Sequence, residues 1–127
     1  MRELITVPGL GNPDRYAAAA VAGGLVFTSG QVAVSQEHPD VPEDFAEEVD
    51  RVLDHLEATL AAAGTNMDHV VKIMAFVDDL DRFDIFNEVY LRRFTPHGLP
   101  ARTTVEVARF RGEKRLELEA IAALPSN

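Results

Sequence analysis

Two stretches of alternating apolar and polar residues, 99–108 and 116–122, constrain the fold of this chain most strongly. Successive side chains of a β-strand point to opposite faces, so alternation with a period of two predicts two strands. Their apolar faces consist of Val105 and Val107 in the first strand and of Leu116, Leu118, Ala120 and Ala122 in the second. The connection Phe110–Lys114 contains Gly112 and is short enough for an antiparallel hairpin.

The polar residues of these two strands are predicted to share the other face of the sheet. A slip of one residue would turn the aliphatic side chains of one strand to the wrong side, so the register should join the two apolar faces. The opposite face then carries Arg102, Thr104, Glu106, Glu117 and Glu119. A small sheet has little structural reason to collect an arginine and several carboxylates there. The pattern therefore indicates a binding or catalytic surface.

Further strands are predicted from short apolar runs bounded by glycine or proline. They lie at Arg2–Val7, Tyr16–Val21, Leu25–Val34 and Val70–Val77, the second and third joined by a Gly-Gly turn.

Two helices are predicted from apolar residues at helical spacing. The first runs from Phe45 to Ala63, with Pro42–Asp44 suited to its start and Gly64 to its end, and the second covers about Leu80–Phe94. The expected fold class is α+β, with both helices on one face of a mixed, mostly antiparallel sheet.

Composition limits the partners and the location of the chain. With 127 residues it is expected to form one domain, 1–127, and no apolar run approaches the length of a membrane span. Its net charge of −9, from 12 basic and 21 acidic residues, argues against nucleic acid as a partner. The one basic cluster, 109–115, is interrupted by Glu113 and is interpreted as a solvated hairpin tip. The absence of a signal pattern and of cysteine favours the cytoplasm.

Arg102 and the glutamates are the first candidates for a functional site. A guanidinium binds a carboxylate through two parallel hydrogen bonds, so Arg102 predicts a small carboxylic acid as ligand. Glu117 or Glu119 is suited to hold and activate a water molecule as general base. Repulsion from the nearby Glu106 is expected to raise the pKa of that base.

Three weaker candidates lie elsewhere in the chain. Asn87 interrupts an otherwise aromatic helix, Tyr16 begins a predicted strand, and Ser29-Gly30 indicates a bulge or a close approach of the backbone to a ligand. The four histidines have no metal-ligand spacing, so no metal site is expected. The surroundings of Ser29 also lack the Gly-x-Ser-x-Gly elbow of serine hydrolases.

Several segments together resemble the Rid family, the reactive intermediate (enamine/imine) deaminases, also labelled L-PSP endoribonucleases or translation inhibitors. They span most of the chain in the order of the family and are Leu25–Gln31, Ala62–Gly64, Val70–Ile73, Phe86–Tyr90, Pro100–Arg102, Val105–Ala108 and Glu117–Ala122.

This resemblance implies a chorismate-mutase-like fold and a homotrimer with clefts between its subunits. It also implies hydrolysis of 2-imino acids, formed from enamines such as 2-aminoacrylate, to 2-keto acids and ammonia without a cofactor. Arg102 then anchors the substrate carboxylate and Glu117 positions the attacking water. The residues that line the pocket by the same resemblance are Tyr16, Ser29, Gly30, Asn87 and Thr104.

The chain departs from the family pattern at two places near the expected pocket. The Gly-Pro-Tyr-Ser-Gln-Ala segment of the family corresponds to Pro13–Ala18, where only Tyr16 is retained, and a frequent cysteine corresponds to Thr104. Both departures bear on the range of substrates. The alternatives left open are an endoribonuclease, a carboxylate sensor without turnover, a deaminase of another substrate and a structural trimer.

Overall fold

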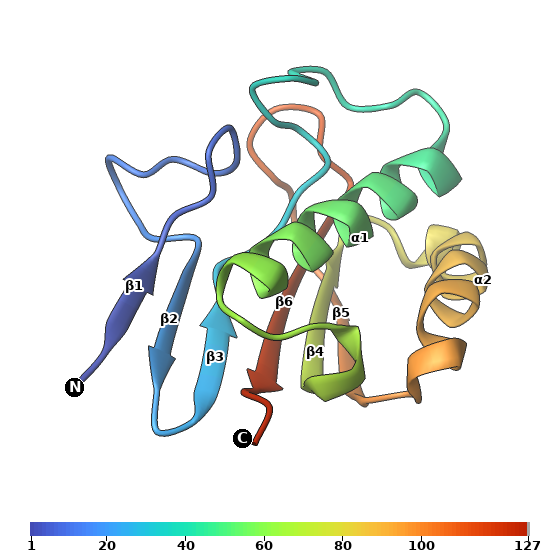
Figure 1. Ribbon diagram of the computed structural model, residues 1–127. Coiled ribbons are helices and arrows are strands. Elements are labelled where there is room, and N and C mark those ends of the chain that lie inside the picture. Colours follow the sequence, from blue (N-terminus) through green and yellow to red (C-terminus); the bar gives the residue numbers. More distant parts are fainter. Residues whose placement is uncertain (127) are drawn as a thin grey trace.

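The computed structural model describes residues 1–126 and consists of one six-stranded sheet and two α-helices (Figure 1). In chain order the elements are β1 (Glu3–Ile5), β2 (Ala19–Ala22), β3 (Leu25–Thr28), α1 (Phe45–Ala62), β4 (Val70–Val77), α2 (Phe83–Phe94), β5 (Ala101–Glu106) and β6 (Leu116–Ala123). Short 3-10 turns at Met67–His69, Leu80–Arg82 and Thr95–His97 precede β4, precede α2 and follow α2.

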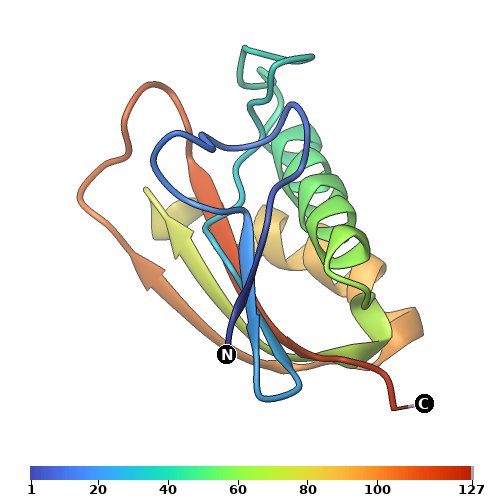
Figure 2. The same cartoon turned by 60° about the vertical axis from the view of Figure 1, so that its left-hand side comes forward.

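The sheet is mixed and mostly antiparallel, with strand order β1-β2-β3-β6-β4-β5. Its one parallel pair joins β4 to β5, as the long connection through α2 allows. Both helices lie on the same side of the sheet, which leaves the other side uncovered (Figure 2). The predicted α+β layer is therefore confirmed.

The helices and the central strand form where their apolar patterns predict them. The apolar stripe of α1 is buried against the sheet, and Gly64, with a φ of +89°, follows the end of the helix. The strand β4 has the predicted bounds. The predicted second helix begins with a 3-10 turn, where the Asp79 and Glu106 carboxylates accept hydrogen bonds from the backbone N–H groups of Asp81 and Leu80.

The predicted hairpin of β5 and β6 is wrong, because β4 lies between these two strands. The connection 107–115 crosses the end of β4, where Val107 donates to the carbonyl of Val77 and Asp78 donates to that of Arg115. The alternation in β5 and β6 identified each as a strand. It contained no information about which strand each pairs with, and the apolar strand β4 takes the place between them.

The predicted common face of the polar residues is wrong as well. Arg102 pairs with Ile73 of β4 and so faces the helices, whereas Glu117 pairs with Phe76 and faces the uncovered side. Thr104 and Glu106 lie on the same face as Arg102, and Glu119 lies on the same face as Glu117. The physical reason is the position of β5 at the edge of the sheet. Helix α2 covers this strand only in part, so polar side chains are tolerated on the side of β5 that faces the helices.

The uncovered face is apolar as well as acidic. Val105, which the alternation assigned to the core, lies on this face and is 38% exposed. Val105 pairs there with Phe76, and the same face also carries Met74, Ile121 and Phe27 on the strands beyond it. No helix within residues 1–126 is both long enough and apolar enough to cross a membrane.

Candidate functional site

The Arg102 side chain lies between the edge strand β5 and helix α2. Its Nη1 donates a hydrogen bond to Oδ1 of Asn87 at 2.8 Å. Its guanidinium carbon lies over the rings of Tyr90, Phe86 and Phe83, at 4.6, 5.5 and 5.6 Å from their centroids. The structure thus brings together two residues, Arg102 and Asn87, that the sequence predicted for one pocket.

Arg102 is partly buried and forms no ion pair, a property that it shares in the described chain with Arg51, which donates to the backbone carbonyl of Asp40. Arg82, Arg93 and Arg115 each form an ion pair with a carboxylate. Within residues 1–126, no carboxylate lies within ion-pairing distance of Arg102, and Asn87 is the one hydrogen-bond acceptor of its guanidinium. A guanidinium has five N–H donors. The remaining donors are therefore available to a ligand.

Thr104 lies on the same side of β5 as Arg102, two residues further along. Its hydroxyl is buried and has no hydrogen-bond partner in the described part of the chain, and the same holds for the hydroxyl of Tyr90. Burial raises the pKa of Tyr90 to about 12, against the opposing effect of the Arg102 charge, so its hydroxyl is neutral at physiological pH. The Arg102 side of the sheet therefore contains two neutral, unpartnered hydroxyls.

The Ser29-Gly30 segment forms a bulge between β3 and β6. Phe27 pairs with Ile121 and Gln31 with Leu118, so residues 28–30 oppose only residues 119–120. Instead of a backbone carbonyl, the Thr28 hydroxyl accepts the hydrogen bond from the N–H of Ala120 at 3.0 Å. One extra residue in a strand bends it and redirects side chains. This bulge ends β3 at Thr28, although the sequence predicted a strand as far as Val34.

Gly30 allows the Glu117 side chain to lie directly against the backbone of the bulge. A Cβ atom on Gly30 would lie 2.8 Å from Cγ of Glu117 and closer still to its carboxylate. Such contacts are too short for any residue with a side chain. Gly30 thus lies in a bulge, which is one of the two roles predicted for it, and its lack of a side chain leaves room for Glu117. The close approach of its backbone to a ligand stays a prediction.

The carboxyl group of Glu117 has an altered acidity. Burial raises its pKa, the ammonium group of Lys114 lowers it, and the carboxylate of Glu119 raises it. The neighbour that repels Glu117 is therefore Glu119. The prediction that Glu106 has this role is wrong, because Glu106 lies on the other face and binds the backbone N–H of Leu80 at 2.9 Å.

A small cavity of about 30 Å³ brings together Tyr16, Ser29 and Gly30. The Ser29 hydroxyl donates to the carbonyl of Ala17 at 2.7 Å and its N–H donates to that of Ala18, which fixes the bulge to the segment after Tyr16. Tyr16 precedes β2, which begins at Ala19 and not at Tyr16 as predicted. Its side chain is 48% exposed.

The predicted site residues therefore form two groups in one chain. Arg102, Asn87 and Thr104 form the first, beneath α2. The second lies around the bulge and consists of Tyr16, Ser29, Gly30 and Glu117. The structure does not bring the two groups together within one copy.

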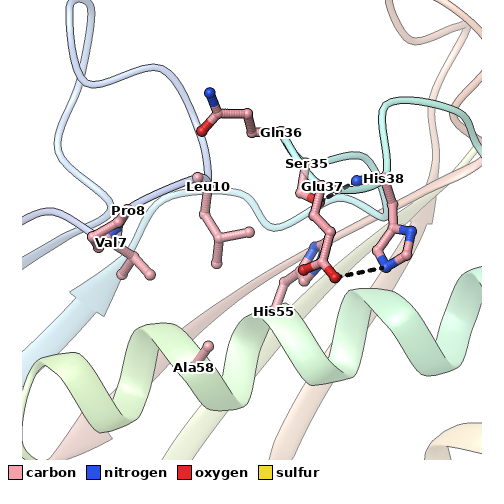
Figure 3. A pocket seen from close by; sticks show the side chains of 10 residues that line it. Val7, Pro8, Leu10, Ser35, Gln36, Glu37, His38, His55 and Ala58 are labelled. Carbon is pink, nitrogen blue, oxygen red and sulfur yellow. Dashed lines mark hydrogen bonds and ion pairs between the residues drawn. The ribbon is translucent and has the colours of Figure 1, made fainter.

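Another cavity, of about 560 Å³, contains none of the predicted site residues (Figure 3). Its polar side chains include those of His38, His55 and Glu37, and Figure 3 shows His55 rising from α1 towards the 35–38 loop. The Nδ1 of His55 forms a hydrogen bond with the backbone carbonyl of Val32 at 2.7 Å. Within residues 1–126, no group of three or more His, Asp or Glu side chains is placed to hold a metal ion.

Sequence reasoning missed two features of these groups. Tyr90 belongs to the apolar stripe of α2, and nothing in the sequence distinguishes its ring, which contacts Arg102, from that of Phe94. Arg115, interpreted as part of a solvated tip, instead donates to the fully buried carboxylate of Glu48 through its backbone N–H and its Nε, at 2.9 and 2.6 Å. Glu48, a glutamate within the apolar stripe of α1, is the sequence feature that could have indicated this buried pair.

Comparisons with known proteins agree with this fold. The family described as Endoribonuclease L-PSP matches residues 10–124. A 2-iminobutanoate/2-iminopropanoate deaminase of Escherichia coli K12 is 38% identical over 109 residues, which cover 84% of this chain and 85% of that protein.

Two solved structures extend the comparison to three dimensions. A Rid family protein of Yersinia pestis, YyfA, has a TM-score of 0.91 at 28% identity and covers 98% of this chain and 100% of its own. Escherichia coli TdcF, solved with bound serine, has a TM-score of 0.87 at 34% identity, with coverage of 97% and 99%. From its sequence and its fold, this chain belongs to the Rid family, which is also the L-PSP endoribonuclease family.

Proposed function

We propose that this protein is a hydrolytic deaminase that converts 2-imino acids, formed from enamines such as 2-aminoacrylate, into 2-keto acids and ammonia. The observation that carries the proposal is the partly buried guanidinium of Arg102, held by Asn87 and without a carboxylate partner in the described chain. A 2-imino acid supplies the missing carboxylate. The deaminase named among the relatives, at 38% identity, supports the same chemistry.

In this proposal Arg102 binds the substrate carboxylate through two hydrogen bonds and fixes the position of the imine carbon. Glu117 accepts a proton from a water molecule as the water oxygen forms a bond to that carbon. That proton passes to the nitrogen and gives a carbinolamine. The carbinolamine hydroxyl then loses its proton, a second proton reaches the nitrogen, the carbon–nitrogen bond breaks, and ammonia leaves as the 2-keto acid forms. An imine is already electrophilic, so these two side chains supply what the reaction requires.

We also propose that the site contains residues of two subunits in a homotrimer of chorismate-mutase-like domains. In one chain the side chains of Arg102 and Glu117 lie on opposite sides of the sheet, so a single copy does not bring these two side chains to one site. The uncovered face exposes Phe27 and Val105 by 42% and 38%, which favours its burial against another copy. The remaining lining residues are Tyr16, Ser29, Gly30, Asn87 and Thr104.

The test is the hydrolysis of imines that an amino acid oxidase generates in situ from several amino acids. Arg102→Lys keeps the charge but loses the planar pair of donors, so we expect kcat/KM to fall about 30-fold or more. Glu117→Gln should still bind a 2-keto acid but should hydrolyse slowly, because an amide does not accept the proton. Wild-type turnover in Arg102→Lys would contradict the anchor. Binding of a 2-keto acid without any turnover by the wild-type protein would indicate a sensor.

The family description also contains the word endoribonuclease, but the charge of the chain argues against that activity. The net charge is −9, and one of the four basic residues of the 109–115 cluster, Arg115, is already paired with Glu48. Affinity for RNA depends on basic residues that neutralise phosphates. We therefore expect no cleavage of RNA by the purified protein.

A further inference from the structure

The guanidinium of Arg102 is supported by aromatic rings as well as by Asn87. Tyr90 and Phe86 are 2% and 0% exposed, and their ring centroids lie 4.6 and 5.5 Å from its central carbon. They lie four residues apart in α2, so they present neighbouring rings on the side of the helix that faces the sheet. A cation over the face of an aromatic ring is attracted by the electrons of the ring.

The hydroxyl of Tyr90 does not explain why a tyrosine ring lies beneath Arg102. It is buried and has no hydrogen-bond partner within residues 1–126, so the contact with the guanidinium is made by the ring alone. The next aromatic residue of the stripe, Phe94, stacks on Tyr90 with centroids 4.7 Å apart. Phe94 makes no cation–π contact with Arg102, as far as the described residues show. The aromatic stripe of α2 thus has an end that contacts Arg102 and an end that does not.

We propose that Tyr90, together with Phe86, positions the guanidinium of Arg102 so that its free N–H donors face the ligand. This inference rests on the proposed function, because it assumes that Arg102 anchors a carboxylate. The two rings lie against the guanidinium, and Asn87 accepts a hydrogen bond from its Nη1. An arginine that is held by such contacts has less rotational freedom to lose when it binds a ligand. Tyr90 and Phe86 are positioning residues, since neither is required to touch the substrate.

The experiment compares Tyr90→Leu and Phe86→Leu with Tyr90→Phe and with Phe94→Leu. Tyr90→Phe keeps the ring and removes only the unpartnered hydroxyl, and Phe94→Leu removes an equally buried ring that does not contact Arg102. We expect the first two variants to raise the KM for imine hydrolysis by roughly 2- to 30-fold, the range of a cation–π contact. Their kcat should change little, because a carboxylate anchor acts equally on substrate and transition state. The two controls should retain the wild-type KM.

A double-mutant cycle separates this proposal from the proposed function. In an Arg102→Met background, Tyr90→Leu should cause no further rise in KM, because the group that it positions is absent. If Arg102→Met itself leaves KM unchanged, the proposed function fails. If Arg102→Met raises KM but the Tyr90→Leu and Phe86→Leu variants match Phe94→Leu, only the positioning role fails. Should Tyr90→Leu not fold, Phe83→Leu removes a partly exposed ring 5.6 Å from the same guanidinium and gives the same test.

Discussion

Arg102 and Glu117 stand on opposite faces of the same sheet, separated by the central strand β4. Arg102 pairs with Ile73, whose side chain is buried beneath the helices, and Glu117 pairs with Phe76 on the uncovered side. One small substrate cannot contact both side chains of one copy across a sheet. If both residues serve one reaction, each site takes Arg102 from one subunit and Glu117 from another.

This arrangement predicts complementation between inactive variants. Arg102→Met and Glu117→Gln should each retain only a small residual activity, but an assembly refolded from an equal mixture should recover about one quarter of the wild-type activity, the fraction of shared sites that are intact after random assembly. The measurement is the release of 2-keto acid before and after joint refolding. A mixture of Arg102→Met with Arg102→Lys is the control and should recover nothing. Failure of the first mixture, with mixed assemblies verified by mass, would exclude a shared site.

Gly30→Ala is predicted to disturb the Glu117 carboxylate with little effect on the fold. The added Cβ would meet Cγ of Glu117 at 2.8 Å, and its three nearest atoms all belong to the side chain of Glu117. We expect kcat to fall roughly 10- to 100-fold, as is usual when a reacting group moves by about 1 Å. The melting temperature should stay close to that of the wild type.

The control for this variant is its combination with Glu117→Gln. Because the base is already absent in that background, Gly30→Ala should reduce the residual activity no further. An additional loss in the double variant would mean that Gly30 contributes through the backbone of the bulge and not through Glu117.

The sequence was sufficient for the elements whose signal is local. The apolar stripe of α1 and the apolar run of β4, which only Lys72 interrupts, predicted the bounds of these elements to within a residue or two. Strand pairing is decided by contacts between distant segments, so the alternation in β5 could not reveal that β4 separates it from β6. The error in pairing then placed Arg102 on the wrong face of the predicted sheet. The family resemblance identified Arg102 and Asn87 independently of the sheet, and these two residues are in contact.

The buried pair of Glu48 and Arg115 predicts a large effect on stability. The Glu48 side chain is 0% exposed and its carboxylate accepts two hydrogen bonds from Arg115, which also donates to the carbonyl of Pro42. Arg115→Leu should leave this carboxylate buried without its cation and lower the free energy of unfolding by about 3–5 kcal/mol. Urea denaturation measures the change.

Two further variants distinguish a buried pair from a general loss of packing. Glu48→Leu combined with Arg115→Leu should be more stable than Arg115→Leu alone, because it removes the unpaired charge. Arg92→Leu breaks an exposed ion pair with Asp50, whose side chains are 59% and 41% exposed, and should cost less than about 1 kcal/mol. Equal losses in Arg92→Leu and Arg115→Leu would contradict this account.

The pH dependence of hydrolysis is predicted to report the environment of Glu117. Burial raises its pKa, Lys114 lowers it and Glu119 raises it, so the carboxylate becomes protonated at a higher pH than an ordinary glutamate. A protonated base accepts no proton from water, and kcat/KM should therefore fall on the acid side at a correspondingly higher pH. Glu119→Gln should move this acid limb to lower pH, and Lys114→Met should move it to higher pH. Profiles that coincide for all three proteins would exclude Glu117 as the titrating base.

The stability of the Glu117→Gln variant gives a second reading of the same pKa. A raised pKa means that the folded protein binds this proton more tightly than the unfolded chain, whose glutamate titrates near 4.3. Stability therefore falls as the pH rises from the unfolded pKa through the folded one, and Glu117→Gln removes this loss. At pH 7 the variant should be more stable than the wild type, and the difference should shrink as the pH falls through the folded pKa towards the unfolded value near 4.3. A variant that is less stable at pH 7 would show that the Glu117 side chain stabilises the fold. That result would contradict a purely catalytic role for Glu117.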